Sequence, residues 1–231
     1  MSLTKPFDLV IFDCDGVLID SEKLATQIDA DELARIGFPT TYEDIVRRYT
    51  GLSAATMRRM VEEEWGRPLP SDFEEVVAAK IKEKYLTELE AIDGIADLLG
   101  QLAVPRCVAS SSAPDKLRLG LERTGLWPLL EPHVFSTVMV SKGKPAPDLF
   151  LFAADRMGAD PARTVVVEDS IAGVQAGVAA GMTVIGFTAG GHCLDDHPER
   201  LLSVGASVVA RSAAQLKSLL CTDQACLRDA G

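Results

Sequence analysis

The sequence predicts an α/β protein: a doubly wound parallel sheet with an α-helical domain inserted after its first strand. Two patterns carry this prediction. In the second part of the chain, short apolar segments alternate with helical segments, an order typical of βαβ units and parallel sheets. Between residues 21 and 89, apolar residues recur at helical spacing and β-branched runs are few, which indicates helices only.

The elements follow in order along the chain. FDLVIF at residues 7–12 is an apolar run of strand formers, and it stops abruptly at DCDG. The helical stretch carries turn signals near Gly37, Gly51 and Pro68. We therefore expect a core formed by residues 1–20 and 90–231, and a helical cap formed by residues 21–89. Further strands are expected at residues 104–109, 134–136, 164–167, 183–187 and 207–210, with helices at 95–102, after Pro114 and at 171–180.

Composition and charge exclude several classes of protein. The net charge is −11 and no cluster of Lys or Arg forms a basic face, so nucleic-acid binding is not expected. No apolar run approaches the roughly 18–20 residues that span a bilayer, and the N-terminus does not look like a signal peptide. The five cysteines have neither metal-ligand nor redox spacing, so we expect free thiols and a cytoplasmic protein. His133, His192 and His197 also lack metal-ligand spacing and are interpreted as ordinary loop histidines.

Polar clusters follow the expected strands, and the carboxyl ends of parallel strands share one edge of a sheet. Each cluster has a simpler explanation when taken alone: a polar turn, a serine loop, a surface turn or a helix N-cap. Their order, each one past a strand, favours a shared site. The clusters are Asp13 and Asp15, Ser110 to Ser112, Lys144, and Glu168 with Asp169.

Phosphoryl transfer explains this set of residue types. Asp13 can act as a nucleophile through an aspartyl-phosphate, and Asp15 can protonate the leaving oxygen and then activate water. Mg²⁺ prefers octahedral oxygen ligands, which Asp13 and Asp169 can supply with help from Glu168 and the Asp15 carbonyl. In addition, Lys144 can neutralise the transferring oxygens, Ser110 with Ser111 beside it can bind the phosphate, and Gly16 lets the backbone turn closely past it.

Four segments resemble the signature motifs of the haloacid dehalogenase-like hydrolases: FDCDGVLIDSE, VASSSAPDK, KGKPAPDLF and VVVEDSIAGVQAGVAAGM. The resemblance covers nearly the whole chain and implies a Rossmann-like core and a Mg²⁺ cofactor. It also implies that Asp13 is the nucleophile, Asp15 the general acid and base, and Ser110 and Lys144 the phosphate contacts. The metal ligands it implies are Asp13, the Asp15 carbonyl and Asp169, with Glu168 the weaker candidate. The helical stretch resembles the cap of the subgroup that includes β-phosphoglucomutase and phosphoglycolate phosphatase.

The branches of this family can be separated by residue. Dehalogenases lack the second aspartate, which is present here as Asp15. β-Phosphoglucomutases carry a histidine and an arginine where this chain has Ala25 and Ala54. The segment ELEAIDG resembles the matching segment of 6-phosphogluconate phosphatases.

We therefore expect a phosphatase of a small phosphorylated metabolite, such as a sugar phosphate or 6-phosphogluconate, acting as a monomer or weak homodimer. A β-phosphoglucomutase-like isomerase and a non-catalytic phosphometabolite-binding protein are the alternatives. The cap would choose the substrate, through residues 20–22, the turn at residues 51–53 and one or two inward-facing basic side chains. The basic candidates are Arg47, Arg48, Arg58, Arg59, Lys80, Lys82 and Lys84.

Overall fold

The computed structural model describes residues 6–49 and 54–221. Six strands form one sheet in the order β3-β2-β1-β4-β5-β6, and every neighbouring pair is parallel. The prediction of a doubly wound parallel sheet is confirmed. The strands are β1 (Leu9–Phe12), β2 (Arg106–Ser110), β3 (Val134–Ser136), β4 (Thr164–Glu168), β5 (Thr183–Phe187) and β6 (Val208–Ala210).

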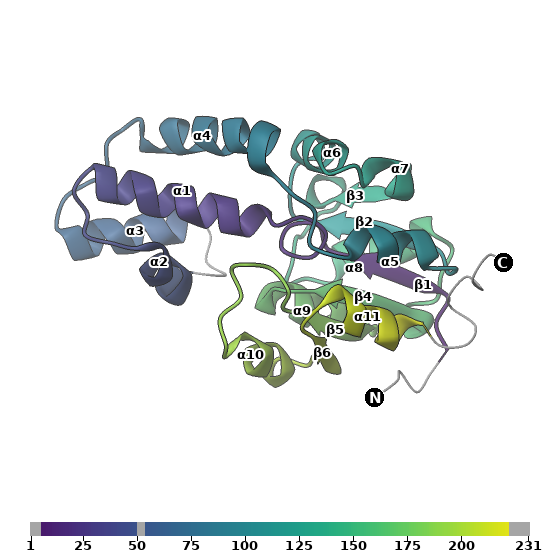
Figure 1. Cartoon of the computed structure of the whole chain (residues 1–231). Coiled ribbons are helices and arrows are strands. Elements are labelled where there is room, and N and C mark those ends of the chain that lie inside the picture. Colours follow the sequence, from purple (N-terminus) through teal and green to yellow (C-terminus); the bar gives the residue numbers. More distant parts are fainter. Residues whose placement is uncertain (1–5, 50–53, 222–231) are drawn as a thin grey trace.

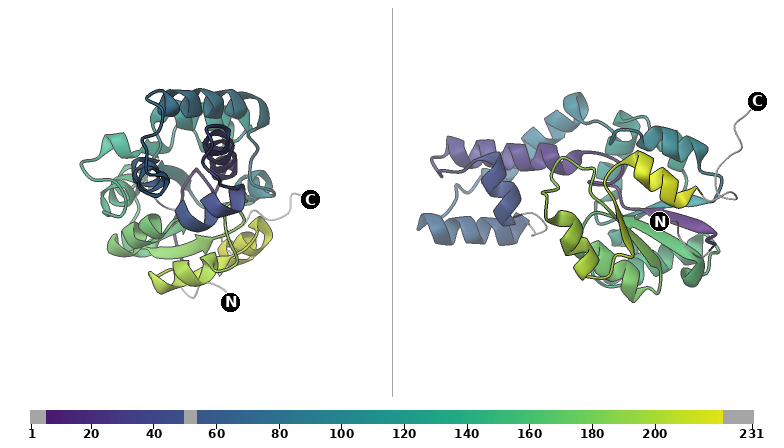
Figure 2. Two further views of the ribbon diagram at one scale, coloured as in Figure 1. Left: turned by 90° about the vertical axis from the view of Figure 1, so that its left-hand side faces the viewer. Right: turned by 60° about the horizontal axis from the view of Figure 1, so that its bottom comes forward.

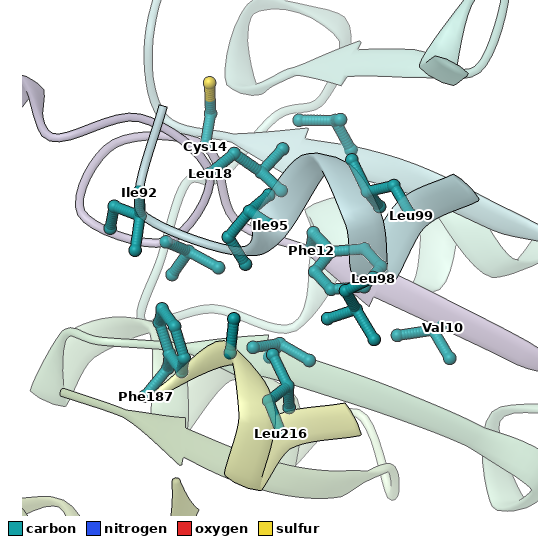
Figure 3. Close-up of a cluster of buried hydrophobic side chains, with 14 of the residues drawn as sticks. Val10, Phe12, Cys14, Leu18, Ile92, Ile95, Leu98, Leu99, Phe187 and Leu216 are labelled. Atoms are coloured by element: carbon teal, nitrogen blue, oxygen red, sulfur yellow. The ribbon is translucent and has the colours of Figure 1, made fainter. Parts of the chain in front are cut away.

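Helices cover both faces of this sheet (Figure 1). Alternate residues of β1 point to opposite faces: Val10 and Phe12 belong to one buried cluster, and Leu9 and Ile11 belong to the other. Figure 3 shows part of the first cluster, in which Phe12 lies near side chains from α5 and α11. That face is covered by α5 (Ile95–Gln101), α6 (Pro114–Arg123), α7 (Trp127–Leu130) and α11 (Ala213–Leu220), and the other by α8 (Asp148–Arg156), α9 (Ile171–Ala179) and α10 (His197–Ser203).

Four helices follow β1 and form what we call the helical insertion (α1–α4). They have a buried cluster of their own, separate from the two that flank the sheet, and they lie beyond one end of the sheet (Figures 1 and 2). The chain leaves and re-enters the sheet layer through two adjacent segments, since Asp20 N donates to Glu90 O and Ile92 N to Leu18 O, both at 3.0 Å. The division into a core and a cap at residues 20 and 90 stays a prediction. The helices are α1 (Ser21–Arg35), α2 (Tyr42–Tyr49), α3 (Ala54–Trp65) and α4 (Phe73–Glu88).

Helix α9 packs closely on the sheet, because a Cβ added at Gly177 would lie 2.6 Å from Val184 Cγ2. Ser110 and Glu168 were expected just past their strands and instead end β2 and β4. Within the described residues, no helix is long and apolar enough to cross a membrane. The turn at residues 51–53 lies outside the described residues.

The cysteines differ from the expectation at one position. Cys14 and Cys107 are buried free thiols and Cys193 is a half-buried one. Cys221 is disulfide-bonded, so the expectation of free thiols throughout is wrong there. The cytoplasmic location stays a prediction.

Candidate active site

Three carboxylates meet at the carboxyl edge of the sheet, where the strand order reverses between β1 and β4. Asp13 follows β1, Glu168 ends β4 and Asp169 comes next. The parallel pairing of the two strands continues one residue further, because Asp13 N donates to Val167 O at 3.0 Å. Carboxylate oxygens of the three acids therefore lie within 4.8 Å of one another, at the position where open α/β sheets bind ligands.

Lys144 reaches this cluster from the loop before α8. Its ammonium lies 2.8 Å from Asp13 Oδ1 and 2.6 Å from Glu168 Oε1, and its side chain is 4% exposed. Burial alone would lower the pKa of Lys144, but the two carboxylates outweigh this and raise it above its ordinary range. The ammonium is thus a fixed positive charge beside Asp13.

The cluster brings three carboxyl groups close to the Lys144 ammonium. Burial raises the pKa of Asp13 well above its ordinary range, Lys144 opposes the shift, and Glu168 and Asp169 add to it. Three acidic side chains around one lysine form an oxygen-rich donor set, which fits the preference of Mg²⁺ for carboxylate oxygens. The residues that could hold the metal are Asp13, Glu168 and Asp169, with the backbone carbonyl of Asp15 nearby in the chain.

Gly16 leaves the space that Asp169 occupies. Its φ is +76°, in the left-handed region that favours glycine. A Cβ added there would lie 2.0 Å from Asp169 Oδ2, so any side chain would displace the carboxylate. The close turn of Gly16 past the phosphate stays a prediction. The structure adds a close approach of Gly16 to Asp169.

Asp15 is held by three groups that sequence reasoning did not assign. Ser21 Oγ donates to Oδ1 at 2.5 Å, Ser112 Oγ donates to Oδ2 at 2.6 Å, and Lys116 Nζ lies 3.1 Å from Oδ1. Burial would raise the pKa of Asp15, but Lys116 and the two hydroxyls outweigh it and lower the pKa. The signals were present: Ser112 ends the serine triplet, and Lys116 closes the motif VASSSAPDK.

The serine triplet divides into three different environments. Ser110, at the end of β2, is 1% exposed, and its Oγ accepts a hydrogen bond from Ser112 N at 3.1 Å. Its hydroxyl proton thereby remains available to a phosphate oxygen. Ser111 is exposed. Of the two serines expected to bind phosphate, Ser110 is buried and Ser111 is exposed. The third serine, Ser112, contacts Asp15.

The start of α9 orients Glu168. Ser170 is the N-cap of this helix and accepts from Gly173 N at 3.0 Å. Glu168 Oε2 in turn accepts from Ser170 N at 2.8 Å and from Ser170 Oγ at 2.9 Å. A Cβ added at Gly173 would lie 1.8 Å from Glu168 Oε1, so the absence of a side chain there lets Glu168 pack under the helix.

Two of the three histidines are not ordinary loop residues, and that interpretation was wrong for them. His192 and His197 are each 4% exposed. His192 Nε2 lies 2.9 Å from Asp169 Oδ2, and His197 Nε2 donates to Asp169 O at 2.6 Å. Both imidazoles therefore fix Asp169, one through its carboxylate and one through its backbone. Burial lowers the pKa of His192, but Asp169 and Cys193 outweigh it and raise the pKa to about 11.

The basic side chains of the helical insertion are largely committed to acidic partners within it. Five of the seven candidates form such pairs, and Arg58 is the most buried of these, with 16% of its side chain exposed. The pairs are Arg48 with Glu64, Arg58 with Glu74, Arg59 with Glu63, Lys80 with Glu32 and Lys84 with Glu88.

This geometry can be compared with known proteins. A family model described as haloacid dehalogenase-like hydrolase matches residues 7–181, a range that contains every residue placed at the edge above except His192 and His197. The chain belongs to the haloacid dehalogenase-like hydrolase family. Its curated relatives include the 6-phosphogluconate phosphatase of Escherichia coli, which is 31% identical over 191 residues covering 82% of this chain and 84% of the relative.

Solved structures of family members agree with this fold. A haloacid dehalogenase-like protein of unknown function from Agrobacterium tumefaciens is 37% identical, with a TM-score of 0.87 over 92% of this chain and 96% of its own. A family hydrolase from Deinococcus radiodurans is 36% identical, with a TM-score of 0.82 over 91% of this chain and 93% of its own, and its structure holds phosphate and sodium.

Proposed function

We propose that this hydrolase is a Mg²⁺-dependent phosphatase of small phosphorylated sugars or sugar acids. The observation that carries the proposal is the pair Asp13 and Asp15, two residues apart but held in different surroundings. Asp13 lies among acids and one lysine, whereas Asp15 is held by two hydroxyls and Lys116. Two carboxylates in different environments can take different roles in one reaction. The phosphatases among its relatives support the same activity.

The proposed reaction has two steps. Asp13 Oδ attacks phosphorus, the bond to the leaving oxygen breaks, and Asp15 gives its proton to that oxygen. Water then attacks the aspartyl-phosphate while Asp15 takes a proton from it, and phosphate leaves with Asp13 restored. In the free protein the pKa of Asp15 is lowered, but a bound phosphate dianion nearby favours its protonated form. Asp15 would thus gain its proton as the substrate binds.

Other side chains at the edge stabilise charge. Lys144, fixed beside Asp13, would neutralise the transferring oxygens, and the Ser110 hydroxyl would donate to one of them. When bound by Asp13, Asp169 and Glu168, Mg²⁺ would supply further positive charge to the phosphate. Because that charge balances three buried carboxylates, Mg²⁺ should also raise the melting temperature of the protein, and by less when Asp169 is changed to Asn.

Replacement of Asp13 by Asn tests the proposal. The variant keeps the shape of the side chain and removes the nucleophile, so phosphate release from an aryl phosphate should fall by on the order of 10⁴-fold or more. Asp155→Asn makes the same chemical change at an exposed site near the end of α8 and should retain activity. A folded Asp13→Asn protein with near wild-type turnover would refute the assignment.

Hydrolysis is proposed over isomerisation. The histidine and arginine that mutases use are Ala25 and Ala54 here, so nothing equivalent at these two positions would hold a second sugar hydroxyl. Hexose phosphates should release free phosphate with little interconversion of position. Chromatography showing rapid conversion of β-glucose 1-phosphate to glucose 6-phosphate without free phosphate would favour the mutase alternative.

The identity of the substrate is the most specific part of the proposal. All substrates share the phosphate contacts at the sheet edge, so selectivity must come from the helical insertion, which would act as a cap. Arg58 is the candidate we favour for a substrate carboxylate, because its side chain is the most buried of the basic candidates; a substrate would have to compete with Glu74 for it. 6-Phosphogluconate is the first compound to test. A clear preference in kcat/KM for nucleotides or phosphoglycolate over every sugar phosphate would contradict this choice.

A further inference from the structure

A second group of ligand-type side chains lies next to the carboxylate cluster. One ring nitrogen each of His192 and His197 and the Sγ of Cys193 lie within 4.8 Å of one another. His192 and Cys193 lie in the loop after β5, and His197 begins α10. In the proposed phosphatase mechanism the two imidazoles only position Asp169, and Cys193 has no role.

Hydrogen bonds hold the loop that carries the cluster. Cys193 N donates to Gly190 O, and His197 N donates to Leu194 O, both at 3.0 Å. Two further bonds join the loop to Asp20 and to the helical insertion, because Gly191 N donates to Asp20 Oδ1 and Tyr42 Oη donates to Gly191 O, again at 3.0 Å. Preorganised ligands lose little freedom when an ion binds.

The His192 ring lies between Gly16 and Gly190. Its Cε1 would lie 2.8 Å from a Cβ added at Gly16 and 2.7 Å from one added at Gly190, so a side chain at either position would collide with the ring. Nδ1 is buried and has no hydrogen-bond partner among the described residues. The polar contacts of the ring are therefore made through Nε2.

Two distances from His192 Nε2 fit a tetrahedral metal site. His192 Nε2 lies 3.5 Å from Cys193 Sγ and 2.9 Å from Asp169 Oδ2. Zinc bonds of about 2.0 Å to nitrogen and about 2.3 Å to sulfur, at the tetrahedral angle, separate the two ligand atoms by about 3.5 Å. The nitrogen and sulfur are thus already at the spacing that one shared ion requires, and Asp169 Oδ2 needs to move by a few tenths of an ångström.

His197 makes a contact that is typical of metal-binding histidines. When its Nε2–H donates to Asp169 O at 2.6 Å, the free lone pair is on Nδ1. Metal-binding histidines usually donate their other N–H to a carbonyl or carboxylate in this way. For Cys193, the thiolate is the form that binds metals.

We propose that His192, Cys193 and His197 form a binding site for Zn²⁺ or a similar borderline transition metal, with Asp169 as the ligand it shares with the active site. Imidazole and thiolate ligands select such metals over Mg²⁺, which prefers oxygen. Binding displaces the protons of His192 Nε2 and Cys193 Sγ. The consequence, which rests on the proposed function, is inhibition: an ion at this site withdraws Asp169 Oδ2 from the carboxylate cluster.

Cobalt binding tests the site without reference to activity. Metal-free protein titrated with Co²⁺ should bind one ion with a thiolate-to-cobalt charge-transfer band in the near ultraviolet, and Zn²⁺ should displace it. The band should persist in Cys107→Ser, because Cys107 is a buried thiol in β2. It should be absent from Cys193→Ser and Cys193→Ala, with near-ultraviolet circular dichroism confirming that both fold. A wild-type titration without the band, or an unchanged band in both Cys193 variants, would overturn the proposal.

Two further measurements separate this inference from the proposed function. Asp13→Asn should retain the cobalt band although it lacks turnover, so an active Asp13→Asn protein would refute the phosphatase mechanism and leave the metal site standing. With Mg²⁺ present, the Zn²⁺ concentration for half-inhibition should be at least about tenfold higher in Cys193→Ser than in wild type, as one lost ligand predicts. Equal zinc sensitivity of the two proteins would overturn the shared-ligand site.

Discussion

Charged side chains are used differently at the sheet edge and in the helical insertion. At the edge, one buried ammonium, Lys144, contacts both Asp13 and Glu168 and is 4% exposed. In the insertion, most pairs are one to one and face solvent: the side chains of Arg59 and Glu63 are 65% and 63% exposed. Glu32 is an exception, because it is 2% exposed and pairs with both Arg35 and Lys80.

This difference between the two regions arises because strand pairing positions the charges at the sheet edge, whereas helix packing positions those of the insertion. Parallel strands in register bring the ends of β1 and β4 together, so their acids are forced into one buried site whose charges must be shared. Helices of the insertion pack through their apolar faces, which leaves most of their charges on the outside, where an exposed pair contributes only about 0–1 kcal/mol. Changes at the edge should therefore alter catalysis strongly, and changes in the insertion should alter stability weakly.

After Asp13→Asn, the largest effect is expected for Asp15→Asn. Two steps of the proposed reaction use its carboxyl group, so kcat on a sugar phosphate should fall by at least about 10²–10⁴-fold. An activated aryl phosphate needs no proton on its leaving group and should still phosphorylate Asp13, which stopped-flow measurement of the phenolate burst can detect. Equal turnover of the variant and wild type on a sugar phosphate would remove Asp15 from the mechanism.

Gly173→Ala should test how tightly the edge is packed. Its Cβ would overlap Glu168, so the variant should lose about 1–3 kcal/mol of stability as overpacked cores do, together with part of its activity. Gly100→Ala is the matched control, because no atom lies within 4 Å of a Cβ added there and alanine favours the helix. Chemical denaturation would measure both, and equal stabilities would show that the edge tolerates repacking.

Lys116→Met should have an intermediate effect on activity. The ammonium lies 3.1 Å from Asp15 Oδ1, and its loss leaves the carboxylate with the two hydroxyls only. We expect about a tenfold drop in kcat with little change in KM, since Lys116 acts through Asp15. The control is Lys217→Met, at an exposed site in the last turn of α11. A rise in KM alone would mean that Lys116 binds substrate instead.

Asp29→Asn should test whether a buried carboxyl group in the helical insertion alters the stability of the protein. Burial raises the pKa of Asp29 to about 6, and Arg58, itself paired with Glu74, opposes the shift. The folded protein thus binds more protons than the unfolded chain between about pH 4 and 6, and the stability of the wild type falls as pH rises through this window. Asp29→Asn should add about 1 kcal/mol at pH 8 and almost nothing at pH 4. Melting curves at both pH values would show it, and a pH-independent gain would assign the effect to another cause.

The smallest effect is expected for Arg59→Ala, which removes an exposed pair with Glu63 at helical spacing. Its loss should change the free energy of unfolding by about 0.3–0.5 kcal/mol, and 0.5 M salt should reduce even that. Denaturant titration at low and high salt measures both the loss of stability and its dependence on salt. A loss above about 1 kcal/mol would mean that the charges of the insertion are coupled like those of the edge.

Residues at the ends of strands were the predictable part of the site. Asp13, Glu168 and Asp169 could be placed because strand ends are visible in the sequence and parallel strands end at one edge. Lys116 and Ser112 lie in a recognisable motif, but their contact with Asp15 depends on where α6 begins. The seven basic residues of the insertion could not be sorted into paired and inward-facing ones, since helical spacing alone does not reveal which neighbouring helix supplies a partner.

The sequence by itself determined the fold class, the family and the carboxylate cluster, because period, strand ends and motif order are local properties of the chain. Tertiary structure alone decided what surrounds that cluster. His192, Cys193 and His197 look unremarkable along the chain, since neither spacing nor composition marks them. They lie beside Asp169 because the loop after β5 turns back over the sheet edge, and because Gly16 and Gly190 leave room for an imidazole there. Contacts between distant segments depend on packing, and packing is settled only when the whole chain has folded.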